Sequence, residues 1–356
     1  MKLGLGLYRH MLTPENFRFA RQCACTHIIV HLVDYFHQSE ADRQNQPVGK
    51  RGEWGRAGDP EKLWSYEELA ALKAEINSHG LEWLAIENLD PAHWHDVLLD
   101  GPRKPQHLEN VKTIIRTMGR VGIPVLGYNF SLAGVAARIQ GPFARGGAVS
   151  VGMDGADETP IPNGMIWNMV YDPSAPAGTV PAITSEQLWQ RLGDFLNAVI
   201  PVAEEAGVTL AAHPDDPPLS LLRGQPRLVY QPRLYQRLID LKPSARNALE
   251  FCVGTLAEMT EGNIYDVVDQ YSRQGKLAYV HMRNVHGKAP HYRETFIDDG
   301  DVDALRVLDI LRQNRFDGVI IPDHTPQMDC GAPWHAGMAF ALGYFRAVLQ
   351  RFEAAS

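Results

Sequence analysis

The sequence has no apolar run long enough to cross a membrane as a helix. It also has no block of lysine and arginine, and its formal net charge is −8. An acidic chain without a basic patch is not expected to bind nucleic acid or an anionic membrane surface. The apolar start at residues 1–7 gives way at once to Tyr8, Arg9 and His10, without a small-residue cleavage site. We therefore expect no signal peptide.

Cysteine is scarce: the chain has four, and Cys23 and Cys25 have a spacing typical of neither a redox motif nor a zinc site. We therefore expect a protein of the reducing cytoplasm. A glycine-rich dinucleotide-binding turn is also missing, because Gly4 and Gly6 lie inside the first predicted strand instead of after it. This absence disfavours an open, doubly wound sheet.

What the sequence does contain is an alternation of short apolar runs and helical patterns. The apolar runs predict strands at residues 3–7, 27–32, 81–87, 124–130, 209–213, 248–251, 277–280 and 319–322. The helical patterns fall at residues 16–23, 65–78, 106–120, 185–206, 233–240, 263–272, 303–313 and 335–352. Such an alternation, without a second composition regime, predicts an α/β fold with one (β/α)8 TIM barrel spanning residues 1–356.

One long segment interrupts this alternation. Residues 131–183, after the fourth predicted strand, are rich in glycine and proline and have no clear period. Segments of this length inside a compact domain are usually functional. We expect an irregular insertion within the barrel domain that acts as a lid or as an interaction arm onto a neighbouring subunit. We also expect a homo-oligomer, either a dimer or a tetramer.

Four consecutive predicted strands end in residue types that bind metal. These residues are His213, Cys252, His281 and Asp323. Each alone has an ordinary structural explanation, such as a hydrogen-bonded histidine or a small buried thiol. Because the carboxyl ends of barrel strands meet at one rim, we expect the four side chains to form one divalent metal site. Mixed nitrogen, sulfur and oxygen ligands favour Zn²⁺, Fe²⁺ or Mn²⁺ over Mg²⁺ or Ca²⁺.

Several motifs together resemble the mannonate dehydratase family. They are Gly127-Tyr128-Asn129-Phe130, His213-Pro214-Asp215-Asp216-Pro217-Pro218, Gly224-x-Pro226-Arg227, Phe251-Cys252-x-Gly254-Thr255-Leu256, Val280-His281-x-Arg283-Asn284, Asp299-Gly300-Asp301-Val302-Asp303 and Pro322-Asp323-His324. The resemblance implies a xylose-isomerase-like barrel, Mn²⁺ as the usual metal, and β-elimination of water from D-mannonate to 2-keto-3-deoxy-D-gluconate. It also implies that His213, Cys252, His281 and Asp323 occupy the family's metal positions.

Further residues are candidates for the chemistry of an elimination. His324, beside Asp323, is a candidate acid or base, or else a partner that orients Asp323. Arg283 is a candidate for binding a substrate carboxylate through two parallel hydrogen bonds, or else an ion-pair partner of Glu294 or Asp298. For Arg227 and Asn129 we weigh substrate binding against a structural role. The histidines around residues 31–37 and 93–95 are interpreted as incidental, although Trp94 could stack on a sugar.

Two segments depart from the family pattern. Residues 131–138 lack its Trp-x-Arg-Thr-like stretch, and the loop at residues 330–335 has Trp334 but no tyrosine, while Tyr344 lies further along in the last predicted helix. Our prediction is a metal-dependent hydro-lyase acting on D-mannonate or a related hexonate. A metal-dependent sugar isomerase or epimerase, and a non-catalytic sugar-binding relative, remain as alternatives. Two His and one Cys favour the lyase, since carboxylate-rich sites are common among such isomerases.

Overall fold

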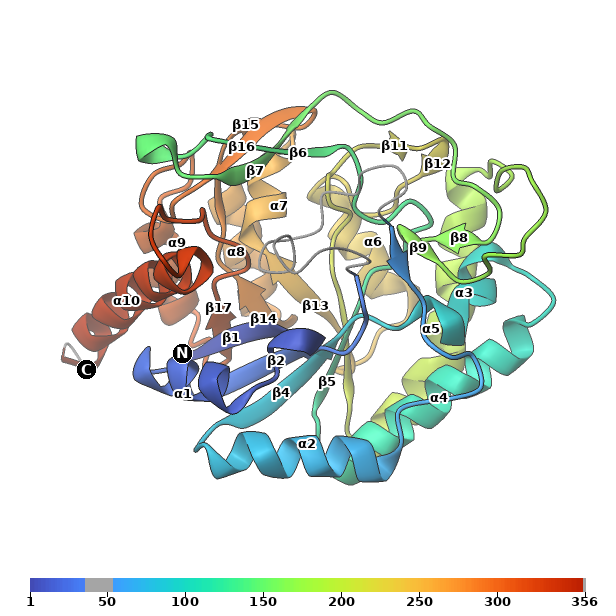
Figure 1. The fold of residues 1–356 in the computed structure, drawn as a ribbon, viewed down its shortest axis with the longest axis horizontal. Coiled ribbons are helices and arrows are strands. Elements are labelled where there is room, and N and C mark those ends of the chain that lie inside the picture. Colours follow the sequence, from blue (N-terminus) through green and yellow to red (C-terminus); the bar gives the residue numbers. More distant parts are fainter. Residues whose placement is uncertain (36–53, 355–356) are drawn as a thin grey trace.

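The computed structural model describes residues 1–35 and 54–354. Eight parallel strands close into a barrel in the order β1-β17-β14-β13-β10-β5-β4-β2 (Figure 1). The strands are β1 (Lys2–Tyr8), β2 (His27–His31), β4 (Glu82–Glu87), β5 (Val125–Tyr128), β10 (Thr209–Ala212), β13 (Asn247–Cys252), β14 (Leu277–His281) and β17 (Val319–Ile321). All eight predicted strands are present, and the predicted (β/α)8 barrel is confirmed.

Helices surround the barrel at the predicted places. They are α1 (Pro14–Gln22), α2 (Tyr66–Ser78), α4 (Lys104–Val121), α5 (Ser185–Ala206), α6 (Arg233–Leu241), α8 (Ile264–Arg273), α9 (Ala304–Gln313) and α10 (Pro333–Ala354). The start of α5 is fixed by a capping box, in which Thr184 and Gln187 each bond the other's backbone amide. Gly207 ends this helix in the left-handed conformation, with φ of 71°.

Two further helices, α3 (Pro91–Leu99) and α7 (Val253–Glu258), were not predicted. Nearly all of α3 and all of α7 is buried, so neither has the exposed polar face that gives an amphipathic helix its sequence period. Short connecting elements are η1 (Arg9–Met11), η2 (Arg145–Gly147), β11 (Leu221–Leu222) and β12 (Gln225–Pro226). No helix in the described ranges has both the length and the apolar character needed to span a bilayer.

The apolar core lies mainly between the barrel and its helices, and a smaller cluster fills the barrel interior. The interior cluster consists of Ile29, Ala85, Val125, Ala211, Tyr279, Val319 and Ile321. Because side chains alternate along a strand, one set of residues packs against the helices while the other points into the barrel. This alternation decides which residues near the strand ends can reach a common site.

The insertion after β5 contains short strands that pair with distant parts of the chain. In one sheet, β6 (Arg138–Gly141) and β7 (Ser150–Asp154) join β16 (His291–Thr295) and β15 (Asn284–Lys288). In another, β8 (Met165–Ile166) and β9 (Met169–Val170) join β3 (Gly55–Arg56). Figure 1 shows both sheets on the side of the barrel where the strands end. β6 pairs with β7 and β8 pairs with β9 as local hairpins, while β7 with β16 and β9 with β3 join distant segments. The sequence showed no period here because strands of two to five residues are too short to display one.

Candidate active site

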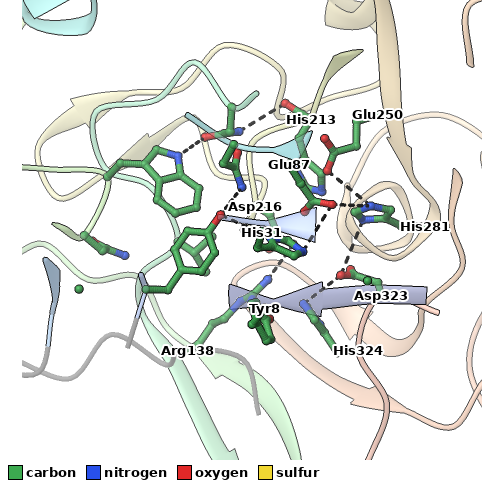
Figure 2. A pocket seen from close by; sticks show the side chains of 18 of the residues that line it. Tyr8, His31, Glu87, Arg138, His213, Asp216, Glu250, His281, Asp323 and His324 are labelled. Atoms are coloured by element: carbon green, nitrogen blue, oxygen red, sulfur yellow. Dashed lines mark hydrogen bonds and ion pairs between the residues drawn. The ribbon is translucent and has the colours of Figure 1, made fainter. Parts of the chain in front are cut away.

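A cleft with about 1260 Å³ of empty space, part of it open to solvent, lies at the carboxyl ends of the barrel strands. Each of the eight strands contributes a lining residue at or near its end: Tyr8, His31, Glu87, Asn129, His213, Glu250, His281 and Asp323. Figure 2 shows most of these side chains converging from different strands. In TIM barrels this end is where catalytic residues gather.

The four predicted ligands come together in this cleft. Ligand atoms of His213, Cys252 and His281 all lie within 4.8 Å of one another. Asp323 completes the group, because its Oδ1 is 3.7 Å from His281 Nδ1 and its Oδ2 is 3.7 Å from Cys252 Sγ. The strand ladder produces this arrangement, since Cys252 pairs with His281 in register at the ends of β13 and β14.

The chemistry of this group fits a bound cation. In the described part of the chain, neither ring nitrogen of the buried His281 makes a short hydrogen bond, although carboxyl oxygens lie 3.5 to 3.7 Å from both. Burial disfavours charge on Cys252, but Arg283 and the neighbouring rings of His213 and His281 outweigh it and lower the thiol pKa to about 6. Burial also opposes protonation of His213, yet Cys252 and Glu250 raise its pKa to about 9. A divalent ion bound between the thiol, the Asp323 carboxylate and the two imidazoles would neutralise this buried negative charge.

Two carboxylates lie on the barrel side of His281. Glu87 Oε2 and Glu250 Oε1 are each 3.5 Å from His281 Nε2. Burial and the neighbouring Glu87 raise the pKa of Glu250 well above its ordinary value. Burial acts on Glu87 in the same direction, but His31 and His281 outweigh it and lower its pKa to about 2. Their surroundings therefore shift the pKa values of the two carboxyl groups in opposite directions.

His324 lies between two carboxylates at the edge of the cleft. Its Nδ1 is 3.1 Å from Glu294 Oε2, and its Nε2 is 3.1 Å from Asp323 Oδ1. Burial disfavours the ionised form of Glu294, but His324 and Arg283 outweigh it and lower the pKa of this carboxyl group. Both predicted roles of His324 are compatible with this geometry, because a ring between two carboxylates can move protons and can also orient Asp323.

Arg283 is placed differently from the predicted substrate fork. Its guanidinium is buried, and it donates to Glu294 at 2.9 Å, Asp216 at 2.9 Å and Glu258 at 2.8 Å. The alternative ion pair with Glu294 is therefore present, and Arg283 does not line the cleft. The prediction assumed strand alternation from His281, but β14 ends at that residue. Arg283 instead turns behind the cleft, where Gly254 has no side chain to obstruct it.

Arg227 and Asn129 are also held by protein contacts. Arg227 is buried, forms an ion pair with Asp215 at 2.8 Å and donates to two backbone carbonyls. These contacts correspond to the structural alternative for Arg227. Asn129 lines the cleft, but its amide group donates to the carbonyls of His213 and Pro214. Its Oδ1 accepts from the indole of Trp167 at 2.9 Å.

Several lining residues were missed from the sequence. Tyr8 and Glu87 end strands β1 and β4, so the rule that identified the four ligands could have found them if applied to the first half of the barrel. Arg138 and Trp167 come from the irregular insertion and gave no local signal. Arg138 Nη2 forms an ion pair with Asp216 Oδ2 at 2.7 Å, and Asp216 in turn accepts from Arg283.

The residues of the two groups that were interpreted as incidental, at 31–37 and 93–95, lie in different environments. His31 lines the cleft, Asp34 is exposed, and His37 lies outside the described residues. Trp94 packs against Phe130 and Phe195 in the core, so it does not offer a surface for a sugar.

His95, Asp96 and His107 form another compact group on α3 and α4. Its contacts are explained by helix packing: His95 Nδ1 lies 2.8 Å from the Pro91 carbonyl, and His107 Nδ1 accepts from the Asp96 amide.

The fold and the cleft are those of a (β/α)8-barrel enzyme with a candidate metal centre at the carboxyl ends of its strands. A sequence profile of the family described as D-mannonate dehydratase (UxuA) matches residues 51–138 and 179–348. The chain therefore belongs to the D-mannonate dehydratase (UxuA) family, as the sequence motifs predicted, and it is a hydro-lyase. Residues 139–178, most of the insertion, lie outside the match.

Individual relatives agree with this assignment. The chain is 30% identical to the mannonate dehydratase of Streptococcus pneumoniae (strain 70585) over 279 residues, which cover 74% of this chain and 75% of the relative. The crystal structure of mannonate dehydratase from Streptococcus suis serotype 2 has a TM-score of 0.76 at 24% identity, covering 100% of this chain and 94% of the other. A xylose isomerase domain protein from Planctomyces limnophilus shares the fold, with a TM-score of 0.58 at 11% identity, covering 98% and 97% of the two chains.

Proposed function

We propose that the protein removes water from D-mannonate or a related hexonate to give a 2-keto-3-deoxy acid, with one divalent ion held by His213, Cys252, His281 and Asp323. The convergence of these four side chains in a member of this family is the main support. Mn²⁺ is the proposed ion, and Fe²⁺ or Zn²⁺ also suit the mixed ligand set. Such an ion supplies Lewis-acid polarisation of a substrate oxygen when bound.

The elimination needs two proton movements, and His324 is the proposed group for them. The hydrogen on the carbon next to a carboxylate is weakly acidic, and the neighbouring hydroxyl leaves as water only after protonation. His324 lines the cleft, and Glu294 at 3.1 Å can stabilise its protonated ring after it accepts the hydrogen. Asp323 contacts the other ring nitrogen and so holds the imidazole beside the ion ligands.

Arg138 is the proposed partner of the substrate carboxylate. It lines the cleft, and its ion pair with Asp216 fixes one edge of the guanidinium. Arg283, first considered for this role, is proposed to act from behind by holding Asp216 and Glu294 in place. Asn129 is proposed to fix the wall and the His213 carbonyl, and Arg227 to brace Asp215.

Residues 131–183 are proposed to cover the active site within the single barrel domain. Arg138, Trp167, Asn168 and Met169 from this segment line the cleft. We therefore expect deletion of residues 141–163, which removes β7 and its pairing with β16, to reduce turnover. Unchanged turnover and unchanged assembly in this variant would exclude both the cover and an arm onto a neighbouring subunit.

The surroundings of the enzyme are also part of the proposal. A reducing, cytoplasmic location suits the Cys252 thiol, which must stay reduced to bind metal. A homo-oligomer, either a dimer or a tetramer, is the proposed assembly, and light scattering of the purified protein tests it. A single-chain mass would refute that assembly.

The decisive experiment incubates the purified protein with a panel of hexonates and Mn²⁺ and assays for a 2-keto-3-deoxy product. We expect product from D-mannonate or a stereoisomer, and none after removal of metal by a chelator. Absence of product from every hexonate, with intact metal binding, would refute the proposed reaction.

A metal-dependent sugar isomerase or epimerase is the second candidate. The compact group of Glu87, Glu250 and His281 is the observation that favours it, since such enzymes commonly use carboxylate-rich sites. Turnover of a neutral ketose without loss of water would identify this activity in the same assay. Binding of sugars without turnover of either class would indicate a non-catalytic relative.

A further inference from the structure

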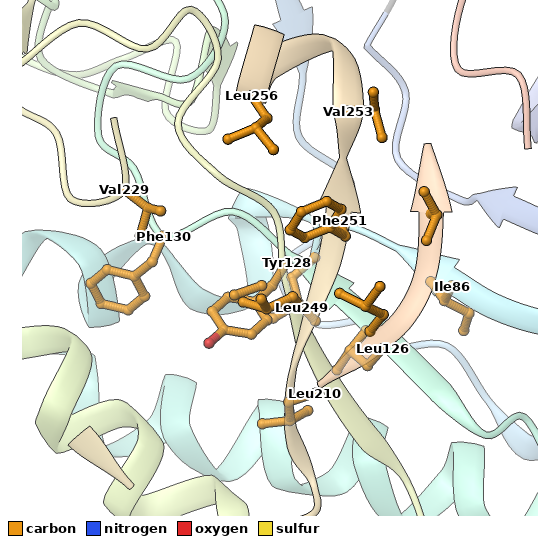
Figure 3. Close-up of a cluster of buried hydrophobic side chains, with 14 of the residues drawn as sticks. Ile86, Leu126, Tyr128, Phe130, Leu210, Val229, Leu249, Phe251, Val253 and Leu256 are labelled. Atoms are coloured by element: carbon orange, nitrogen blue, oxygen red, sulfur yellow. The ribbon is translucent and has the colours of Figure 1, made fainter. Parts of the chain in front are cut away.

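Glu87 and Glu250 are unusual residues for the interior of a barrel. Interior positions in this fold are normally filled by branched apolar side chains, yet these two carboxyl groups are only 7% and 1% exposed. Glu250 points inward because its neighbours Leu249 and Phe251 pack in the outer core (Figure 3). The same alternation along β13 turns Cys252 inward, so one strand supplies both a proposed ligand and a carboxyl group beneath it.

Both carboxyl groups meet the same nitrogen of a proposed ligand. His281 Nε2 lies 3.5 Å from Glu87 Oε2 and 3.5 Å from Glu250 Oε1. The other ring nitrogen, Nδ1, lies 3.7 Å from Asp323 Oδ1, on the side of the proposed ion (Figure 2). The two nitrogens therefore face different groups, two carboxyls on one side and the ligand cluster on the other.

Neighbouring residues hold this arrangement in place. Tyr279 donates from its hydroxyl group to Glu87 Oε2 at 3.2 Å. Gly127 leaves room for Glu250, because a side-chain carbon there would collide with Glu250 Oε2. Glu87 on β4 and Glu250 on β13 approach His281 from separate strands, so together they restrict both the position and the rotation of its ring.

We propose that Glu87 and Glu250 are positioning residues that accept the Nε2–H of His281 and thereby present Nδ1 to the metal ion. The inference rests on the proposed metal centre. A histidine whose far nitrogen donates to a carboxylate keeps one tautomer and one orientation, and it becomes a stronger ligand. A second carboxyl group on the same nitrogen leaves the ring no alternative partner on that side.

The test measures metal binding and the protonation of His281 separately from turnover. Mn²⁺ affinity of the metal-free protein is measured by calorimetry for Glu87→Gln, Glu250→Gln and Glu87→Ala, with thermal unfolding as a check on folding. We expect binding about 10- to 100-fold weaker, with the glutamine variants least affected because the amide oxygen still accepts a hydrogen bond. Tyr279→Phe, which removes only the hydroxyl group that holds Glu87, should weaken binding less than any of these.

Nitrogen NMR of the Zn²⁺-loaded protein then decides whether these residues position the ring or only add negative charge. We expect the proton of His281 on Nε2 in the unmodified protein and a mixture of tautomers in Glu87→Ala. Asp96→Asn is the matched control, since Asp96 is a buried carboxyl group outside the barrel, and it should leave both measurements unchanged.

A proton on Nδ1, or unchanged affinity in all the Glu87 and Glu250 variants, would overturn the inference. His213→Ala separates this failure from failure of the metal centre itself. If His213→Ala abolishes binding while the glutamate variants retain it, only the positioning role is refuted. If His213→Ala also binds Mn²⁺ normally, the proposed metal centre is refuted as well.

Discussion

The floor and the wall of the cleft are built in different ways. The floor consists of His213, Cys252, His281 and Asp323 at the ends of β10, β13, β14 and β17, all inside the family match. The wall is the part of the insertion outside the match, which brings Trp167, Asn168 and Met169 to the cleft. Floor residues are positioned by a continuous strand ladder, while wall residues depend on individual contacts such as Trp167 with Asn129.

This difference predicts that the floor carries the chemistry and that the wall sets the substrate preference. Chemistry needs ligand atoms held to within a fraction of an ångström, and a closed barrel supplies that rigidity. A wall built from loops can change without disturbing the ladder beneath it. Variants in the floor should therefore abolish the reaction, whereas variants in the wall should change which substrate is preferred.

The largest effect is expected from the floor. In His213→Ala/His281→Ala the ion should be lost, and kcat/KM should fall at least about 1,000-fold, because a metal contributes several kcal/mol to such reactions. Metal analysis and turnover measure the two effects. Cys252→Ala should also lose metal, whereas its matched control Cys330→Ala, at an exposed cysteine, should not. Full metal occupancy in the double variant would refute the proposed site.

His324→Asn should lower kcat about 100- to 10,000-fold, as expected when a general acid or base is removed. Its metal content should stay near normal, because His324 is proposed to move protons and not to bind the ion. His335→Asn is a matched control, since His335 contacts Asn16 on α1 and does not line the cleft. Loss of metal together with activity would instead show that His324 serves mainly to orient Asp323.

Arg138→Ala should raise KM for a hexonate and lower kcat/KM. Loss of a hydrogen bond to a charged group costs about 1.5–3 kcal/mol, roughly a 13- to 160-fold effect. Arg138→Lys should recover part of this loss, since lysine keeps the charge but lacks the planar fork. Arg145→Ala is the control, because Arg145 lies in the same insertion but is half-exposed and pairs with Asp298. Equal kinetics in Arg138→Ala and Arg145→Ala would remove Arg138 from substrate binding.

The smallest effect is expected from the wall. Trp167→Ala should raise KM about 2- to 13-fold, the range for loss of an aromatic contact of about 0.5–1.5 kcal/mol. Mn²⁺ affinity should not change, because Trp167 is connected to the floor indirectly, through Asn129 and the His213 carbonyl. Kinetics on several hexonates would reveal a change of preference. A loss of metal binding in this variant would mean that wall and floor are one unit.

The sequence by itself determined the barrel and the four floor residues. Eight apolar runs with helical patterns between them are local signals, and the geometry of a parallel barrel brings every strand end to one rim. His213, Cys252, His281 and Asp323 could therefore be grouped although up to 110 residues separate them. Helices such as α2 and α5 were predictable for the same reason, because their caps and apolar faces depend on residues close together in the sequence.

Only the tertiary structure decided the partners of the remaining side chains. Arg283 follows His281 closely in sequence, but the end of β14 turns it toward Asp216, Glu258 and Glu294. Arg138 and Trp167 reach the cleft because the insertion pairs with distant strands. Helix α3 could not be predicted, because a helix buried on nearly all sides has no amphipathic period in its sequence. Local patterns fix elements and their ends, whereas contacts between distant residues depend on packing that no single segment encodes.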